Sequence, residues 1–178
     1  MLITNETLNT IHTRRSCRAY TAQQVEPDKL DAVIDAGLWA ASGMGRQSQV
    51  IAAVQDKNAI AKLSAINAMI MGTSGDPFYG APTVLVVLAR REVPTAVEDG
   101  SLTMGSMMLA AESIGLASCW VHRAKETFET EAGRQLLAAW GLDPDAYIGV
   151  GNLILGYAAE GGVKPAAARK EGRVVYVK

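Results

Sequence analysis

The chain of 178 residues is 49% hydrophobic and 20% charged, with a net charge of -1 at pH 7. This composition is typical of an ordered globular protein and excludes an intrinsically disordered one. The near-neutral charge and the lack of a long apolar run argue against nucleic-acid binding and against a membrane span. We expect one domain covering residues 1–178, in a cytoplasmic protein without a signal peptide.

Cysteine and histidine are scarce. The chain has two cysteines, Cys17 and Cys119, and two histidines, His12 and His122. The cysteines lie far apart and outside any CxxC motif, so we expect reduced thiols and neither a disulfide nor a zinc site. The sequence predicts no metal site.

Hydrophobic periodicity and turn signals predict alternating helices and strands. In chain order we expect a helix at 5–14, a helix from Pro27 to about 41, a strand at 49–55, a helix after Asp56, a loop at 72–80, a strand at 83–89, a helix at 97–115, a strand at 118–122, a helix at 129–140, and strands at 148–156 and 173–177. This order indicates the α+β class.

For three of these elements the sequence also predicts their place in the fold. Residues 83–89 (TVLVVLA) are apolar on both faces, which indicates a central strand. The helix at 97–115 has little polar surface, so we expect it to be buried in the core or in a subunit interface. The strand at 173–177 has no hairpin partner, and we expect it to pair with a sheet edge of a second subunit.

Four segments are candidates for ligand binding, and each has a plainer alternative. Residues 14–18 (RRSCR) suit a phosphate, or form a solvated basic turn. Residues 41–47 (ASGMGRQ) let a flat ligand approach the backbone, or only end a helix. Residues 115–123 end in a strand whose backbone N–H groups can donate to a ligand, or form an ordinary buried strand. The basic cluster within 164–170 completes a phosphate site, or stays in solvent.

Taken together and in this order, the segments resemble the nitroreductase family. RRSCR is similar to the family's RRSxR element, ASGMGRQ to PSxxNxQPW, and LGYAAEGGVKPAAARK to the ending LGYP…KP…RK. DGSLTMGSMMLAAESIGLASCWV resembles the central helix and following strand. The resemblance implies an α+β, three-layer fold with an antiparallel-dominated mixed sheet flanked by helices. It also implies a homodimer with a domain-swapped C-terminal strand and with FMN at the subunit interface.

The resemblance also implies which residues bind the cofactor. Arg14, Arg15 and Ser16 match positions that hold the phosphate and ribityl groups, and Arg18 matches a cationic position near the flavin pyrimidine edge. Ser42, Gly43 and Gly45 match a segment that reaches the flavin of the other subunit. The remaining cofactor-binding positions are Gln47, the backbone of Val121, His122 and Arg123 near the flavin N5, and Arg169 and Lys170 as phosphate contacts whose register is open.

The implied activity is oxidation of NADH or NADPH by FMN and reduction of a small organic acceptor, such as a nitroaromatic or a quinone. The kinetics would be ping-pong with two-electron steps, and no side chain is assigned as a catalytic residue. A role for His122 as proton donor is a secondary hypothesis.

Several residues depart from the family pattern. Ala41 replaces proline, Gly45 replaces asparagine, Ser48 and Gln49 replace a Pro-Trp pair, and Ala158 replaces the proline of LGYP. These departures leave alternatives open: an FMN-binding sensor or store without turnover, or a flavin-remodelling or dehalogenating relative. A purely structural dimeric domain is a further alternative.

Overall fold

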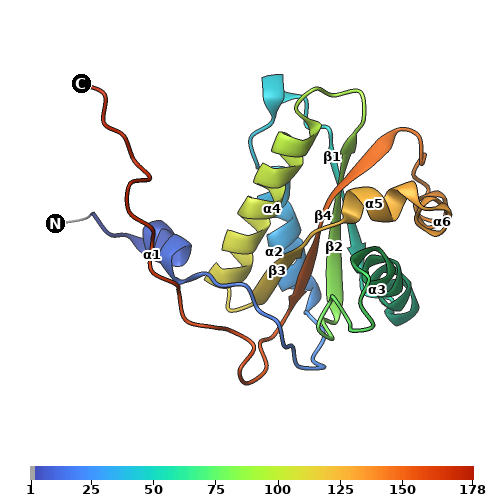
Figure 1. The fold of residues 1–178 in the computed structure, drawn as a ribbon, viewed down its shortest axis with the longest axis horizontal. Coiled ribbons are helices and arrows are strands. Elements are labelled where there is room, and N and C mark those ends of the chain that lie inside the picture. The colour runs from blue at the N-terminus through green and yellow to red at the C-terminus, as the bar shows by residue number, and fades with distance from the viewer. Residues whose placement is uncertain (1–2) are drawn as a thin grey trace.

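The computed structural model describes residues 3–178. Its elements are α1 (Glu6–Thr13), α2 (Pro27–Leu38), the short 3-10 helix η1 (Gly43–Gly45), β1 (Gln49–Val54), α3 (Lys57–Met71), β2 (Thr83–Arg90), α4 (Ala96–Ser113), β3 (Ala117–Val121), α5 (Ala124–Glu129), α6 (Glu131–Ala139) and β4 (Tyr147–Gly156) (Figure 1). None of the helices within the described residues combines the length and hydrophobicity needed to cross a bilayer.

A four-stranded sheet forms the middle layer, in the order β1-β2-β4-β3. Helices α2 and α4 cover one face, and α3, α5 and α6 cover the other (Figure 1). The α+β, three-layer prediction is confirmed. The prediction of a mixed sheet needs correction for the single chain, because all neighbouring strands in residues 3–178 are antiparallel. The parallel pairing in this part of the chain is one isolated bridge between Ser16 and Ser118.

Strand β2 lies at the centre of the hydrophobic core, as its apolar sequence predicts. Leu85, Val87 and Ala89 face the cluster under α2 and α4, whereas Val84 and Val86 face the opposite cluster. Successive side chains of a strand point to opposite faces, so a strand between two helical layers must be apolar throughout.

Side-chain capping marks where α1, α3 and α6 begin. The side chains of Asn5 and Asp56 accept hydrogen bonds from backbone N–H groups in the first turns of α1 and α3. The helix expected at 129–140 is confirmed as α6, but a separate helix before it, α5, was not predicted; the two are divided at Thr130. This residue has extended backbone angles, and its hydroxyl accepts from the N–H of Gly133 at 3.0 Å, which starts a new helix.

Helix α2 also ends earlier than expected, at Leu38. The N–H of Gly43 donates to the Asp99 carboxylate at 2.9 Å, so the following segment is tied to α4 and does not continue the helix.

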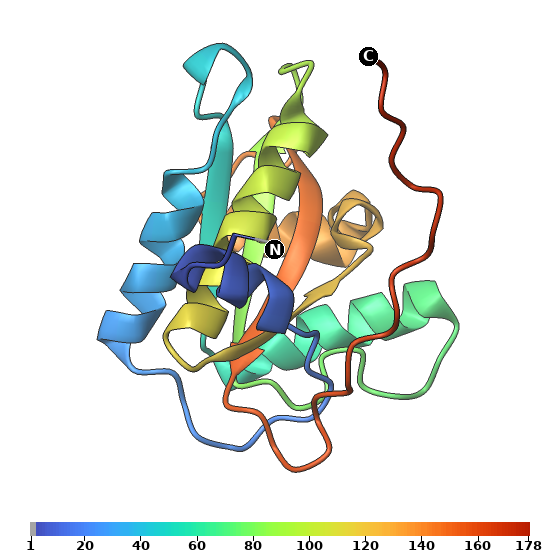
Figure 2. The same ribbon diagram turned by 90° about the vertical axis from the view of Figure 1, so that its left-hand side faces the viewer.

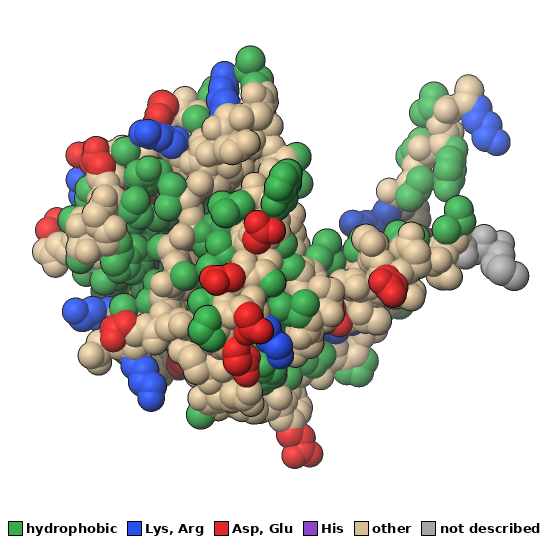
Figure 3. All heavy atoms as spheres, turned by 180° about the vertical axis from the view of Figure 1, so that it is seen from behind, with side chains coloured by type: hydrophobic (Ala, Val, Ile, Leu, Met, Phe, Trp, Pro, Cys, Tyr) green, Lys and Arg blue, Asp and Glu red, His purple; other side chains and the backbone are tan. Residues whose placement is uncertain are grey.

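The C-terminal tail, residues 164–178, has no regular secondary structure and extends away from the body of the molecule (Figures 1 and 2). Largely hydrophobic side chains near its end stand clear of the body (Figure 3). Val174, Val175, Tyr176 and Val177 are between 68% and 93% exposed. Within residues 3–178 nothing pairs with 173–177, so this segment forms no strand in the single chain, and its pairing with a second subunit stays a prediction.

Candidate functional site

A basic cleft of about 680 Å³ lies between the end of α1 and the start of the tail. Its lining residues are Ile11, His12, Arg14, Arg15, Ser16, Arg18, Lys164, Pro165, Ala166, Ala167 and Arg169. The structure thus brings the early arginines together with the C-terminal basic cluster, which is about 150 residues away in the sequence. Lys170, the alternative to Arg169, does not line the cleft.

Short backbone pairings hold the two segments together. The N–H of Cys17 donates to Ser118 of β3 at 3.0 Å, and Cys17 also forms an antiparallel bridge with Val163. The N–H of Arg18 donates to the carbonyl of Gly162 at 2.8 Å. Residues 16–18 therefore lie between the outer edge of β3 and the start of the tail, so the side chains before and after them meet in one cleft (Figure 2).

The cleft is strongly cationic. Five of its lining residues are Arg or Lys, and no carboxylate lines it among the described residues. Nη1 of Arg14 is buried and has no hydrogen-bond partner in residues 3–178. A buried donor without a partner is costly, so this atom indicates an acceptor supplied by a ligand. The cleft suits a phosphate, which accepts several charge-assisted hydrogen bonds.

The other guanidinium groups have partly structural roles. Nη1 of Arg15 donates to the carbonyls of His12 and Arg14, both at 2.7 Å, and so closes the end of α1. Arg169 donates to the carbonyl of Ala167 at 2.7 Å, which orders the tail where it borders the cleft.

Beneath the cleft, the backbone rests on buried side chains. Cys17 is fully buried, and the hydroxyl of Tyr20 donates to the Cys17 carbonyl at 3.2 Å. Burial, together with the nearby Cys17 thiol, raises the pKa of Tyr20 far above its usual range, so this phenol stays protonated as a donor. The Cys17 position of RRSCR thus anchors the segment, whereas the arginines are free to line the cleft.

The segment containing Ser42, Gly43, Gly45 and Gln47 lies elsewhere, between α2 and β1 and above the start of α4 (Figure 1). The N–H of Gln47 donates to the Ser42 hydroxyl at 3.0 Å. Gly45 has φ +65°, in the left-handed region that glycine and asparagine tolerate best. Glycine therefore suits this position, where the resemblance implies an asparagine. None of these four residues lines the basic cleft of the same chain.

Val121, His122 and Arg123 form the turn from β3 into α5. Arg123 has φ +75°, an uncommon angle for a residue with a side chain. Asn67 of α3 is fully buried and donates from Nδ2 to the His122 carbonyl at 2.8 Å. The His122 side chain is exposed.

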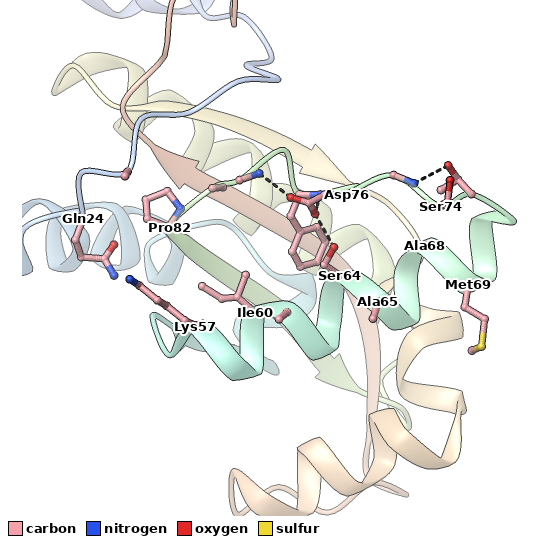
Figure 4. A pocket seen from close by; sticks show the side chains of 17 residues that line it. Gln24, Lys57, Ile60, Ser64, Ala65, Ala68, Met69, Ser74, Asp76 and Pro82 are labelled. Carbon is pink, nitrogen blue, oxygen red and sulfur yellow. Dashed lines mark hydrogen bonds between the residues drawn. The ribbon is translucent and has the colours of Figure 1, made fainter.

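A second, larger cavity of about 1030 Å³ lies between α3 and the loop at 72–82. Its walls are mainly apolar, and Lys57 and Gln24 lie close together at one end (Figure 4). Asp76 holds the loop: it accepts from the Ser64 hydroxyl and from the N–H groups of Phe78 and Gly80. The cavity offers room for an apolar molecule with an acceptor group at its Lys57 end.

Sequence reasoning missed Asn67 and the large cavity. An asparagine within the helical stretch SAINAMIM carries no signal that it bonds to a strand end 55 residues later. Ile11 and His12 of the basic cleft were also missed, although their place immediately before RRSCR is a signal that could have found them.

Known proteins are similar to this chain in sequence and in fold. The model of the nitroreductase family matches residues 11–157. A nitroreductase of Bacteroides fragilis with bound FMN is similar in structure, with a TM-score of 0.87, 31% identity, and coverage of 98% of this chain and 100% of the other. A nitroreductase of Desulfitobacterium hafniense with bound FMN also has a TM-score of 0.87, with 26% identity and coverage of 99% and 100%.

A curated relative from Archaeoglobus fulgidus, provisionally named NADH dehydrogenase/NAD(P)H nitroreductase, is 27% identical over 137 residues, which cover 74% of this chain and 76% of the relative. Family model, fold and the order of the sequence elements agree, and the chain belongs to the nitroreductase family.

Proposed function

We propose that the chain is an FMN-dependent oxidoreductase that works as a homodimer and passes two electrons from NADH or NADPH to a small organic acceptor. The observation that carries this proposal is the convergence of Arg14, Arg18, Lys164 and Arg169 on one cleft without a carboxylate. A cleft of about 680 Å³ is within the range of small-molecule sites. The solved relatives that bind FMN support the choice of ligand.

The residues divide the binding between them. The phosphate group of FMN is held by Arg14, Arg15, Ser16 and Arg169, and it supplies the hydrogen-bond acceptor that Nη1 of Arg14 lacks in the described chain. Arg18 places positive charge near the pyrimidine edge, which favours negative charge on the reduced flavin. Lys170 is a less favoured phosphate contact because it lies outside the cleft lining. When bound, FMN supplies the hydride chemistry, and the protein supplies binding, orientation and electrostatics.

The second subunit completes the site. Ser42, Gly43, Gly45 and Gln47 lie away from the cleft of their own chain, so they contribute to the cleft of the partner. Exposed apolar side chains near this segment and on α4 support an interface there. They are Leu38, Trp39, Met44, Val97 and Leu102, each more than half exposed in the single chain.

The tail supplies a second dimer contact. Residues 16 and 17 pair with the outer edge of β3, which leaves β1 as the free edge of the sheet. A groove of about 450 Å³ runs along β1 and is closed on one side by Trp140 and Leu142. The exposed apolar residues of 173–177 fit such an edge as an added strand, donated by the partner.

The test is a spectrum of the purified protein with FMN, followed by anaerobic mixing with NADH and with NADPH. We expect bound FMN in about one copy per chain and loss of its visible absorbance with at least one nicotinamide, faster than for free FMN. A nitroaromatic or a quinone then restores the absorbance. Protein that does not bind FMN contradicts the proposal.

One observation favours a second candidate, an FMN-binding protein without turnover, such as a sensor or store. Ser48 and Gln49, in place of the family's Pro-Trp pair, each have a buried polar atom without a partner in the described chain. If these groups reshape the acceptor side of the flavin, FMN binds but neither nicotinamide bleaches it. A flavin-remodelling or dehalogenating relative would instead consume the flavin or a halogenated acceptor.

His122 stays a proposal as proton donor. The change His122→Ala removes the side chain but leaves the backbone that Asn67 holds. Unchanged turnover with unchanged FMN binding would exclude the proton role.

A further inference from the structure

We infer that Asn67 is a positioning residue that fixes the direction of the Arg123 backbone N–H, so that this N–H donates to the N5 edge of the flavin. The inference rests on the proposed function and deepens it. Asn67 lies on α3, outside all four family motifs, and is 0% exposed.

The covalent geometry of the peptide links the two groups. The His122 carbonyl and the Arg123 N–H belong to one peptide unit, and the described chain contains no cis peptide bond. In a planar trans peptide the C=O and the N–H point in opposite directions. Nδ2 of Asn67 binds the carbonyl from inside the protein at 2.8 Å, so the N–H points away from α3.

The Arg123 N–H is free to serve a ligand. Residues 3–178 offer it no hydrogen-bond acceptor, and the β3–β4 ladder ends two residues earlier, at Val121 and Asn152. It lies where α5 begins, and Arg123 itself is half-buried. A donor at this place without an acceptor is suited to a ligand that brings one.

The turn needs an external restraint, because Arg123 occupies the left-handed region at φ +75°. On one side the backbone of Ala124 packs directly against Gly149 of β4, where any side chain would clash. On the other side Asn67 binds the His122 carbonyl. The Asn67 hydrogen bond and the Gly149 contact therefore restrain the strained 122–123 peptide from two sides and keep it in one orientation.

The orientation of the Asn67 amide is also determined. Its Oδ1 is buried without a hydrogen-bond donor in the described chain, whereas Nδ2 has the His122 carbonyl. A flipped amide would place two acceptor oxygens against each other. The residue therefore keeps one unsatisfied buried atom, and the hydrogen bond to His122 is its polar function.

The experiment compares Asn67→Leu with the wild type, using FMN and 5-deaza-FMN as ligands. Leucine has the shape of asparagine but no donor, and 5-deaza-FMN has a C–H in place of N5 and accepts no hydrogen bond there. We expect Asn67→Leu to lower the affinity for oxidised FMN about 2- to 10-fold, which corresponds to the free energy of one neutral hydrogen bond. Its affinity for 5-deaza-FMN stays within error of the wild type.

A second readout is the midpoint potential of bound FMN. If only the oxidised form loses affinity, a 2- to 10-fold loss raises the two-electron potential by about 10–30 mV. The matched control is Thr103→Val, which removes another buried, unpartnered polar atom, on α4, and should change neither value. Asn67→Ser, whose hydroxyl falls about one bond length short, replaces the leucine variant if that variant does not fold.

Equal losses for FMN and 5-deaza-FMN would show a merely structural role and overturn the inference, as would an unchanged affinity and potential. Failure of the proposed function is distinguishable, since the wild type itself would then not bind FMN or would not be reduced.

Discussion

Arg14 offers a test of the cleft that separates phosphate recognition from folding. Nη1 of Arg14 is buried without a partner, so the protein without ligand gains little from it. A hydrogen bond to a charged group contributes about 1.5–3 kcal/mol. The change Arg14→Gln should therefore weaken FMN binding about 10- to 150-fold. The affinity for riboflavin, which has no phosphate, should fall at most about 2- to 10-fold, because one neutral contact at most is lost.

The ligand-free protein should respond in the opposite way. Removal of a buried donor without a partner costs no hydrogen bond, so the free energy of unfolding of Arg14→Gln should equal or exceed that of the wild type. Calorimetric titration with FMN and riboflavin, and urea unfolding without ligand, measure both effects. Arg134→Gln, on α6 in the opposite helical layer, is the control for loss of one positive charge.

Three outcomes would refute the reasoning: an unchanged FMN affinity, equal losses for FMN and riboflavin, or a clear drop in stability without ligand. A drop in stability without ligand would mean that Arg14 stabilises the fold and is not reserved for binding a phosphate.

Three other predictions concern packing, pH and assembly. A methyl group on Gly100 of α4 would lie 2.6–3.0 Å from side-chain atoms of Val150. Gly100→Ala should therefore lower the free energy of unfolding by about 1–3 kcal/mol, measured by urea titration at fixed protein concentration. Adding Val150→Ala to the same chain should restore part of this loss. The hydrogen bond from the Tyr157 hydroxyl (2.6 Å) lowers the pKa of Glu26, so the ionised carboxylate stabilises the fold above pH 4.5, and this contribution is lost as the pH falls through the lowered pKa. In Tyr157→Phe the pKa of Glu26, followed by NMR, should rise toward 4.5. An unchanged pKa would show that this hydrogen bond does not lower it. Deletion of residues 171–178 should raise the dimer dissociation constant about 100-fold or more, measured by sedimentation, because the apolar side chains that are exposed in the single chain would no longer be buried on the partner. An unchanged dissociation constant would show that the tail is not part of the dimer interface.

Much of the fold could be predicted because the periodic elements are long. The β2 strand, with its unbroken apolar run, and the helices capped by Asn5 and Asp56 carry strong local signals. Helix α5 was missed because its six residues start from a left-handed Arg123 without a side-chain cap. Tertiary contacts with α3 and β4, and not local propensity, make this segment helical.

The candidate site was predicted in part for the same kind of reason. RRSCR and the basic tail are local charge clusters, visible in any reading of the chain. Their convergence depends on the backbone pairings of Cys17 with Ser118 and Val163, which no local pattern reveals. Asn67 could not be found because its partner is a backbone carbonyl, which leaves no trace in residue identity.

The exposed tail has a consequence for the tendency of the single chain to aggregate. Val174 to Val177 is a short, β-prone apolar run, and such runs promote aggregation when they are left unpaired. Arg173 and Lys178 flank the run, and charges in such positions act as gatekeepers against stacking of identical copies. We therefore expect these two charges to oppose aggregation through the exposed run.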